Sequence, residues 1–185
     1  TTHLVMSSPA DLRPRLLEMD DLEVRLVQPP SPQLNHALFM EIGTPYRWFS
    51  RLGWEYSDWR RYVEDPQVET WIGYLAGCPF GYAELQSRGA LTEILFFGVF
   101  QAYAGRGLGA HLLTRAVERA WKIAGTEQVY VHTCTSDHPA ARANYLARGF
   151  TATREVTQEE EIPDEGDPVW ASPAYYRSLQ KRNSE

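Results

Sequence analysis

The 185-residue sequence predicts one α/β domain, in which helices flank a central mixed, mostly antiparallel sheet of six to seven strands. Three observations predict this class. Three β-rich runs follow one another with turn residues between the first two, a long periodic helix comes next, and strand and helix patterns alternate after it. The composition, 43% hydrophobic and 23% charged, is that of an ordinary globular protein, and the length suits a single domain.

The first half of the chain predicts short elements around an antiparallel meander. Residues 1–20 mix Ser, Pro and charge without a sustained period, so we expect a loosely ordered lead-in before a domain over residues 21–171. Gly77-Cys78-Pro79 is typical of a hairpin turn. The elements expected, in chain order, are a strand at residues 24–27, helices at 32–42 and 59–64, and strands at 69–76, 80–86 and 91–100.

The second half begins with the clearest helical pattern, at residues 107–124. Apolar side chains recur there with a period of 3.6 residues, at Leu108, Leu112, Leu113, Ala116, Val117, Ala120, Trp121 and Ala124. Gly125 is suited to the left-handed cap that ends such a helix. The pattern predicts an amphipathic helix that packs one face against the sheet.

The remaining elements alternate to the end of the domain. A strand at 129–135 precedes a helix that begins at Asp137-His138-Pro139, where a polar cap residue and a first-turn proline coincide. Gly149 ends that helix before a last strand at 150–156. We expect the acidic residues 159–168 to form a solvated loop and residues 172–185 to form a C-terminal tail.

Charge and composition exclude several classes of function. The 18 Lys and Arg residues against 24 Asp and Glu residues leave a net charge of −6, which argues against nucleic acid as a partner. No run approaches the roughly 20 apolar residues of a membrane span, and residues 1–10 lack a signal-peptide pattern. Cys78 and Cys134 are too few for a disulfide scaffold or a zinc site. We therefore expect a cytoplasmic protein without a metal or a membrane partner.

The loop between the third meander strand and the long helix is rich in glycine. Gly105, Gly107 and Gly109 let a ligand approach the backbone and leave the first helical N–H groups exposed, which is typical of a pyrophosphate site. The Gly-Lys-Ser/Thr of a nucleoside-triphosphate loop is absent. A dinucleotide fold is excluded as well, because the acid at the required spacing, Glu127, precedes the second strand instead of following it.

Two segments resemble motifs of the GNAT acyltransferases. Residues 93–99 and 104–109 are similar to motif A, and residues 137–150 are similar to motif B, in the family order. The resemblance covers about residues 22–157. It implies the GNAT fold, with the sheet splayed at the fourth strand, and transfer of an acetyl group from acetyl-CoA directly to an amine.

The resemblance also implies which residues bind the cosubstrate. The family pattern has a long polar side chain where this chain has Ala104, a contact that Arg106 could replace, and an asparagine where it has His138. The residues expected to bind acetyl-CoA are Phe97, Gly98, Val99, Ala104, Gly105, Arg106, Gly107, Leu108, Gly109, Ala110, His138 and Ala141.

Catalytic roles follow from the resemblance and from acid–base chemistry. An alkylammonium with a pKa of about 10 must lose a proton before it attacks, and Glu93 is the expected base, with Glu84 as its substitute. Tyr145 matches the family's general acid for the departing thiolate. A bulge at Gly98-Val99 is expected to expose a backbone N–H to the reacting oxygen. The alternatives are a solvated Glu93 and a packed Tyr145.

The acceptor site is predicted from aromatic and arginine residues. Because arginine pairs with carboxylates and indole stacks on rings, amino acids or aryl-alkylamines are expected in preference to polyamines. His132 alternates away from the neighbouring threonines and is expected to be packed. The residues expected to bind the amine are Tyr46, Arg47, Trp48, Arg51, Glu84 and Thr133.

The predicted function is N-acetylation of a primary amine on a small molecule. Two alternatives stay open, a protein N-terminal or lysine acetyltransferase and a non-catalytic acyl-CoA-binding module. The sequence also leaves open a homodimer, the identity of the acceptor and the length of the acyl chain.

Overall fold

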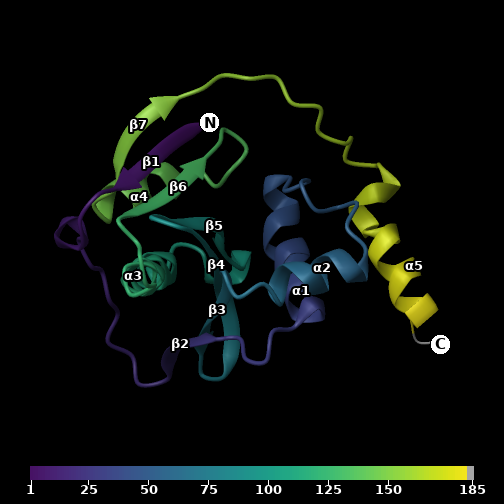
Figure 1. Cartoon of the computed structure of the whole chain (residues 1–185), viewed down its shortest axis with the longest axis horizontal. Coiled ribbons are helices and arrows are strands. Elements are labelled where there is room, and N and C mark those ends of the chain that lie inside the picture. The colour runs from purple at the N-terminus through teal and green to yellow at the C-terminus, as the bar shows by residue number, and fades with distance from the viewer. Residues whose placement is uncertain (183–185) are drawn as a thin grey trace.

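The computed structural model describes residues 1–182 and places seven strands in one sheet (Figure 1). Their spatial order is β2-β3-β4-β5-β6-β1-β7, and every neighbouring pair is antiparallel except the parallel pair β5 and β6. This sheet confirms the predicted fold class. The strands are β1 (Thr2–Met6), β2 (Leu22–Leu26), β3 (Val68–Leu75), β4 (Cys78–Arg88), β5 (Leu91–Val99), β6 (Gln128–Thr133) and β7 (Thr151–Glu155).

Helices cover both faces of the sheet, and the alternation of side chains along β4 assigns the two faces. Ala83 and Leu85 pack into the core beneath α3 and α4, whereas Tyr82 and Glu84 face the layer of α1 and α2. The α5 helix lies outside α2, far from α3 (Figure 1). The helices are α1 (Pro32–Gly43), α2 (Tyr56–Val63), α3 (Leu108–Ala120), α4 (Ala141–Ala147) and α5 (Pro173–Arg182).

The two parallel strands stay together over only three residues. Leu91 to Glu93 of β5 pair with Gln128 to Tyr130 of β6, and the pairing ends there although β5 continues to Val99. Beyond Glu93, β4 is the only strand among the described residues that pairs with β5. One edge of β5 therefore carries backbone N–H and C=O groups that face the space between the diverged strands.

A β-bulge lies at the start of this divergence. Successive β4 residues pair with Phe96 and Ile94, so Leu95 is an extra residue on β5. The bulge was expected at Gly98-Val99 and lies three residues earlier. Its position next to the last parallel pair explains why the sheet opens in the middle of β5 and not at its end.

The N-terminal residues differ from the expected lead-in. Thr2–Met6 form β1, an internal strand between β6 and β7, with Leu4 and Met6 buried in the core. Two apolar residues at alternate positions are too weak a signal to predict a strand whose partners lie more than 120 residues away. The following segment runs along α3, where the Leu17 N–H donates to His111 Nδ1 at 3.1 Å.

The expected C-terminal tail forms α5 as far as Arg182. Its Tyr175 ring stacks on His36 of α1, with 3.8 Å between ring centroids, and Trp59 of α2 meets the same imidazole edge-on at 5.3 Å. These aromatic contacts hold α5 against the α1 and α2 layer, and they bury His36 to 4% exposure. Long-range packing, which the polar sequence of the segment does not predict, therefore orders it.

Two turns differ from the expected positions. The hairpin between β3 and β4 turns at Ala76-Gly77, both with positive φ (49° and 78°), so Cys78 already belongs to β4. Asp137 does not cap α4, which begins at Ala141. Its carboxylate instead closes the turn that follows β6.

The buried His36 makes stability depend on pH. Burial lowers the pKa of this imidazole to about 4. The unfolded chain, with an ordinary pKa near 6.5, binds the proton that the folded chain excludes, so stability is present above about pH 6.5 and is lost as pH falls toward 4. In urea unfolding at pH 7 and pH 4.5, we expect wild type to lose about 2 kcal/mol more than His36→Phe. Equal losses would contradict this assignment.

Candidate active site

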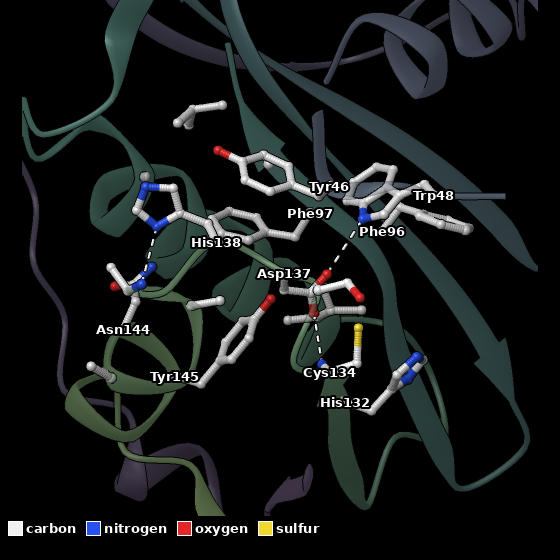
Figure 2. A pocket seen from close by; sticks show the side chains of 18 of the residues that line it. Tyr46, Trp48, Phe96, Phe97, His132, Cys134, Asp137, His138, Asn144 and Tyr145 are labelled. Atoms are coloured by element: carbon white, nitrogen blue, oxygen red, sulfur yellow. Dashed lines mark hydrogen bonds between the residues drawn. The ribbon is translucent and has the colours of Figure 1, made fainter. Parts of the chain in front are cut away.

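A cavity of about 750 Å³ opens where β5 and β6 diverge (Figure 2). The glycine loop before α3 and Arg15 line one end of it. The β5 residues Ile94–Val99 and Tyr145 of α4 line its middle, and the turn at Tyr46–Ser50 lines the other end. Sequence segments from both helix layers and both diverged strands thus meet around one space.

The glycine loop offers a row of unused backbone donors. The N–H groups of residues 105–109 have no acceptor among residues 1–182, and α3 has no side-chain cap at its N-cap residue, Gly107. Gly105 and Gly107 have φ of 74° and 79°, a left-handed conformation that glycine adopts without strain. These donors lie at the positive end of the α3 dipole, so the loop is built to hold an anion.

Ten of the twelve residues expected to bind acetyl-CoA line the cavity. They are Phe97, Gly98, Val99, Ala104, Gly105, Gly107, Gly109, Ala110, His138 and Ala141. The two residues that do not line it, Arg106 and Leu108, flank Gly107. Arg106 lies outside, with its guanidinium 5.4 Å from the Tyr103 ring centre, and Leu108 is buried in the core because the first turn of α3 directs its side chain toward Phe80 and Leu112.

Tyr145 lies in the middle of the cavity wall, on the α4 side of the opening (Figure 2). Its ring meets Phe97 and Phe150 edge-on, with centroids 6.1 Å and 6.0 Å away, and only 5% of the residue is exposed. Burial, and then the negative charge of Asp137, raise the pKa of the Tyr145 hydroxyl. The hydroxyl therefore remains protonated at neutral pH and has a hydrogen to donate.

Asp137 is a cavity residue that was not among the assigned site residues. Its Oδ2 accepts hydrogen bonds from the Thr133 hydroxyl at 2.8 Å and from the Cys134 N–H at 2.9 Å, and Trp48 Nε1 donates to Oδ1 at 3.4 Å. Thr133, expected to touch the amine, is buried and orients Asp137 instead. The sequence did contain a signal for this residue, because Asp137 is an acid that shortly follows a strand and precedes His-Pro. It was interpreted mainly as a helix cap.

Glu84 and Arg51 are paired outside the cavity. Both are buried, at 0% and 3% exposure, and Arg51 reaches the two carboxylate oxygens at 3.1 Å and 3.0 Å while the Tyr62 hydroxyl donates to Oε2 at 2.7 Å. Five aromatic rings surround the guanidinium within 6 Å, those of Phe39, Trp54, Trp59, Tyr62 and Phe96. The pair joins the α1 and α2 layer to the sheet.

Glu93 also lies behind the cavity wall. Its side chain is only 7% exposed and forms an ion pair with Arg88 at 3.2 Å. His132, which was expected to be packed, has a 42% exposed side chain and lines the cavity. His132 and Thr133 do lie on opposite faces of β6, as the alternation predicts. The face of His132, however, is the one that the diverging strands leave uncovered.

Tyr46, Arg47 and Trp48, which were expected to bind the amine, line the cavity. Arg47 has a left-handed φ of 55°, and its Nη2 donates to the carbonyl of Pro163 at 2.7 Å. This bond ties the acidic segment after β7 across the cavity, where Glu160 joins the lining. Neither this segment nor Arg15 belongs to a periodic pattern, so the sequence contains no signal that they reach the site.

Among residues 1–182, no three His, Cys, Asp or Glu side chains gather as metal ligands. No helix in the same span is long and apolar enough to cross a membrane.

Several solved structures share the fold at low sequence identity. A spermidine N-acetyltransferase from Vibrio cholerae, in complex with CoA and spermine, is 18% identical with a TM-score of 0.63 over 78% of this chain and 89% of its own. An aminoglycoside acetyltransferase from an uncultured soil metagenomic sample, in complex with sisomicin, is 14% identical with a TM-score of 0.61 over 78% and 98%.

A third structure, a GCN5-related N-acetyltransferase from Kribbella flavida, is 18% identical with a TM-score of 0.60 over 82% of this chain. The chain spans about half of that protein, 53% of its length. No curated protein sequence matches. The model of the acetyltransferase (GNAT) family matches residues 35–150, which is more than half of the chain. The chain therefore belongs to the acetyltransferase (GNAT) family, whose members are acetyl-CoA-dependent N-acetyltransferases.

Proposed function

We propose that the chain binds acetyl-CoA along the glycine loop and the diverged strands, and transfers the acetyl group to a primary amine of a small cationic molecule. One observation carries this proposal. A continuous cavity joins the free N–H groups of residues 105–109 to a chamber lined by Trp48, Asp137 and Glu160. Direct transfer needs two molecules with their reacting atoms about 3–3.5 Å apart, and such a cavity can hold both.

The cosubstrate half rests on the fit of charge and shape. The N–H row and the dipole of α3 suit a pyrophosphate, and the Arg15 side chain, which lines the same end, adds a positive charge. Along the opening, Phe97 and Val99 present apolar surface to a pantetheine arm. The unpaired edge of β5 offers backbone N–H groups to the arm and to the thioester oxygen.

Tyr145 is suited to assist the departing sulfur. Its hydroxyl is protonated, because burial raises its pKa, so it can donate a hydrogen bond as negative charge develops on the thiolate. A thiol has an ordinary pKa of about 8.5, below that of tyrosine, so complete proton transfer from Tyr145 runs uphill. Tyr145 thus stabilises the leaving group, and solvent completes the protonation.

The acceptor chamber favours a small molecule over a protein. The turn that carries Tyr46 and Trp48 lines it, and the Arg47 bond to Pro163 joins this turn to a second lining segment, that of Glu160 and Ile162. A lysine or an N-terminus on a folded protein would need these joined segments to open. The proposed acceptor is therefore a free amine.

The charges of the chamber favour a polycationic acceptor over an amino acid. Asp137 and Glu160 line it and outnumber the one arginine there among the described residues, Arg47, whose Nη2 is directed to the Pro163 carbonyl, while Arg51 is neutralised by Glu84 outside the cavity. The expected pairing of arginines with a substrate carboxylate therefore loses its support. Two proteins of similar fold, described as an aminoglycoside acetyltransferase and a spermidine N-acetyltransferase, support the same class of acceptor.

The cosubstrate site is tested by Gly109→Val. A Cβ there meets only Val99, at 3.8 Å, so the protein should fold, while the added side chain obstructs the N–H row. We expect calorimetry to give a Kd for CoA that is about tenfold or more weaker, equivalent to about 1.4 kcal/mol or more. Gly53→Val, at a position with open space outside the cavity, is the control. Unchanged affinity in folded Gly109→Val would remove the loop from the site.

Tyr145→Phe tests the leaving-group role. We expect kcat to fall about tenfold, the lower end of the range for an acid–base group, because a hydrogen bond to sulfur is lost while the ring packing stays. The pH profile between 6 and 9 should keep its shape, since the Tyr145 hydroxyl does not ionise there. A new or missing alkaline limb in the variant would contradict this role.

The acceptor class is tested by the release of CoA with a panel of amines. We expect kcat/KM for spermidine and for an aminoglycoside to exceed that for amino acids by about tenfold or more, since repeated ammonium groups meet two carboxylates. Glu160→Gln should raise KM for spermidine about two- to fivefold, the strength of an exposed ion pair. Glu161→Gln, which removes an equal charge from outside the cavity lining, should not. A preference for amino acids would refute the cationic acceptor.

A further inference from the structure

A row of polar side chains crosses the sheet where the parallel pairing ends. Glu93 is the last β5 residue that pairs with β6, opposite Tyr130, and His132 is two residues further along β6. His3 of β1 is directly opposite His132, and its Nδ1 lies 2.5 Å from the Tyr130 hydroxyl. The row thus stands at the apex of the opening, on the face turned away from α3.

Only one member of this row lines the cavity. The Glu93 carboxylate is buried, with Oε2 3.2 Å from Arg88 Nη2 and Oε1 3.6 Å from His132 Nδ1. The His132 ring is 42% exposed and belongs to the cavity wall. Its Nε2, on the far side of the ring from Glu93, has no hydrogen-bond partner among the described residues.

Two carboxylates near the site, those of Glu84 and Asp137, already accept several hydrogen bonds. Glu84 accepts from Arg51 and Tyr62 in the core, and Asp137 accepts from Thr133, Cys134 and Trp48. None of these groups can take a proton without the loss of bonds that hold the local structure. The His132 imidazole lines the cavity and has one nitrogen without a hydrogen-bond partner among residues 1–182, so it is suited to accept a proton.

We propose that His132 Nε2 accepts the proton of the substrate ammonium, and that Glu93 acts through it as a positioning residue. The proposal rests on the proposed acetyl transfer. One proton passes from the ammonium to Nε2, and the neutral nitrogen bonds to the thioester carbon. The carbon–sulfur bond then breaks with its electron pair on sulfur, the nitrogen loses its second proton, and the thiolate gains one. His132 returns its proton to solvent.

The surrounding charges suit this cycle. Glu93, next to Nδ1, stabilises the imidazolium that forms, and the Arg88 guanidinium holds the carboxylate in place. Tyr130 lies beside His132 on β6, and His3 faces His132 from β1. Arg154 of β7 interacts electrostatically with His3, and Glu160 lines the cavity from the segment between β7 and α5. Burial, and then the charge of His132, lower the pKa of His3, so His3 stays neutral beside it.

The experiment measures pH profiles of kcat/KM with spermidine, and CoA affinity by calorimetry. We expect His132→Gln to lower kcat/KM about 10²-fold and to remove the acid limb of the profile, as loss of a general base does. Glu93→Gln should lower it about tenfold and move the acid limb to lower pH, because the imidazolium loses its carboxylate. Neither variant should change the Kd for CoA more than twofold. Glu127→Gln, outside the cavity, is a matched control that should keep both readouts.

Added imidazole should restore part of the activity of His132→Ala, which a misfolded variant would not permit. An active wild type whose His132→Gln variant keeps kcat/KM within twofold, or keeps the acid limb, overturns this inference alone. An intact acid limb in Glu93→Gln at its wild-type position overturns the role of Glu93. A wild type that binds CoA but acetylates no amine overturns the proposed function, and the inference falls with it.

Discussion

The early end of the pairing between β5 and β6 is the constraint on which the site depends. The strands share three residue pairs before the bulge at Leu95 carries β5 away, while β1 holds β6 from its other side over five pairs. Because β1 holds β6 in place, β6 cannot follow β5 or re-pair with it in another register, and a gap remains between the two strands. The gap exposes the backbone edge of β5 and allows Phe97, Tyr145 and Trp48 to form the walls of one cavity. The glycine loop follows β5 directly, so its free N–H groups lie at the mouth of the same gap.

A buried ion pair holds the second layer in place around this opening. Arg51 follows the turn that bears Trp48, and its pairing with Glu84 of β4 anchors that turn to the sheet. Two desolvated charges are stable together only with good geometry and further hydrogen bonds. The Tyr62 hydroxyl donates such a bond to Glu84, and the aromatic rings around the guanidinium add cation–π contacts. Loss of one partner of such a pair typically costs about 3–5 kcal/mol. The pair therefore positions the aromatic wall without touching what the cavity binds.

The site divides its tasks between the two faces of the sheet. Helix dipole, free N–H groups and Tyr145 belong to the side of α3 and α4, where negative charge on phosphate and sulfur needs donors. His132 belongs to the other side, where a cation binds and loses a proton in the proposed reaction, and Asp137, bonded to Thr133 and to Trp48, lies between the two sides. The segment that connects β7 to α5 (Figure 1) is joined to the turn at residues 46–50 by the hydrogen bond from Arg47 to Pro163. In the proposed function, acceptor choice thus depends on a segment without regular secondary structure.

The sequence alone determined the meander, the amphipathic α3 and the glycine loop, because each depends on a local period or on conformations that glycine adopts without strain. It also identified most of the residues that line the cavity near the glycine loop, since the backbone geometry of a loop depends on residues nearby in the sequence. Tertiary structure decided the rest. Alternation along β6 places His132 and Thr133 on opposite faces but does not reveal which face stays open. The sequence likewise does not show whether a carboxylate such as Glu84 is solvated or paired with an arginine such as Arg51. Contacts between residues far apart in the chain determine the position of β1 in the sheet and the burial of Glu93 behind His132. A local sequence pattern cannot predict such contacts.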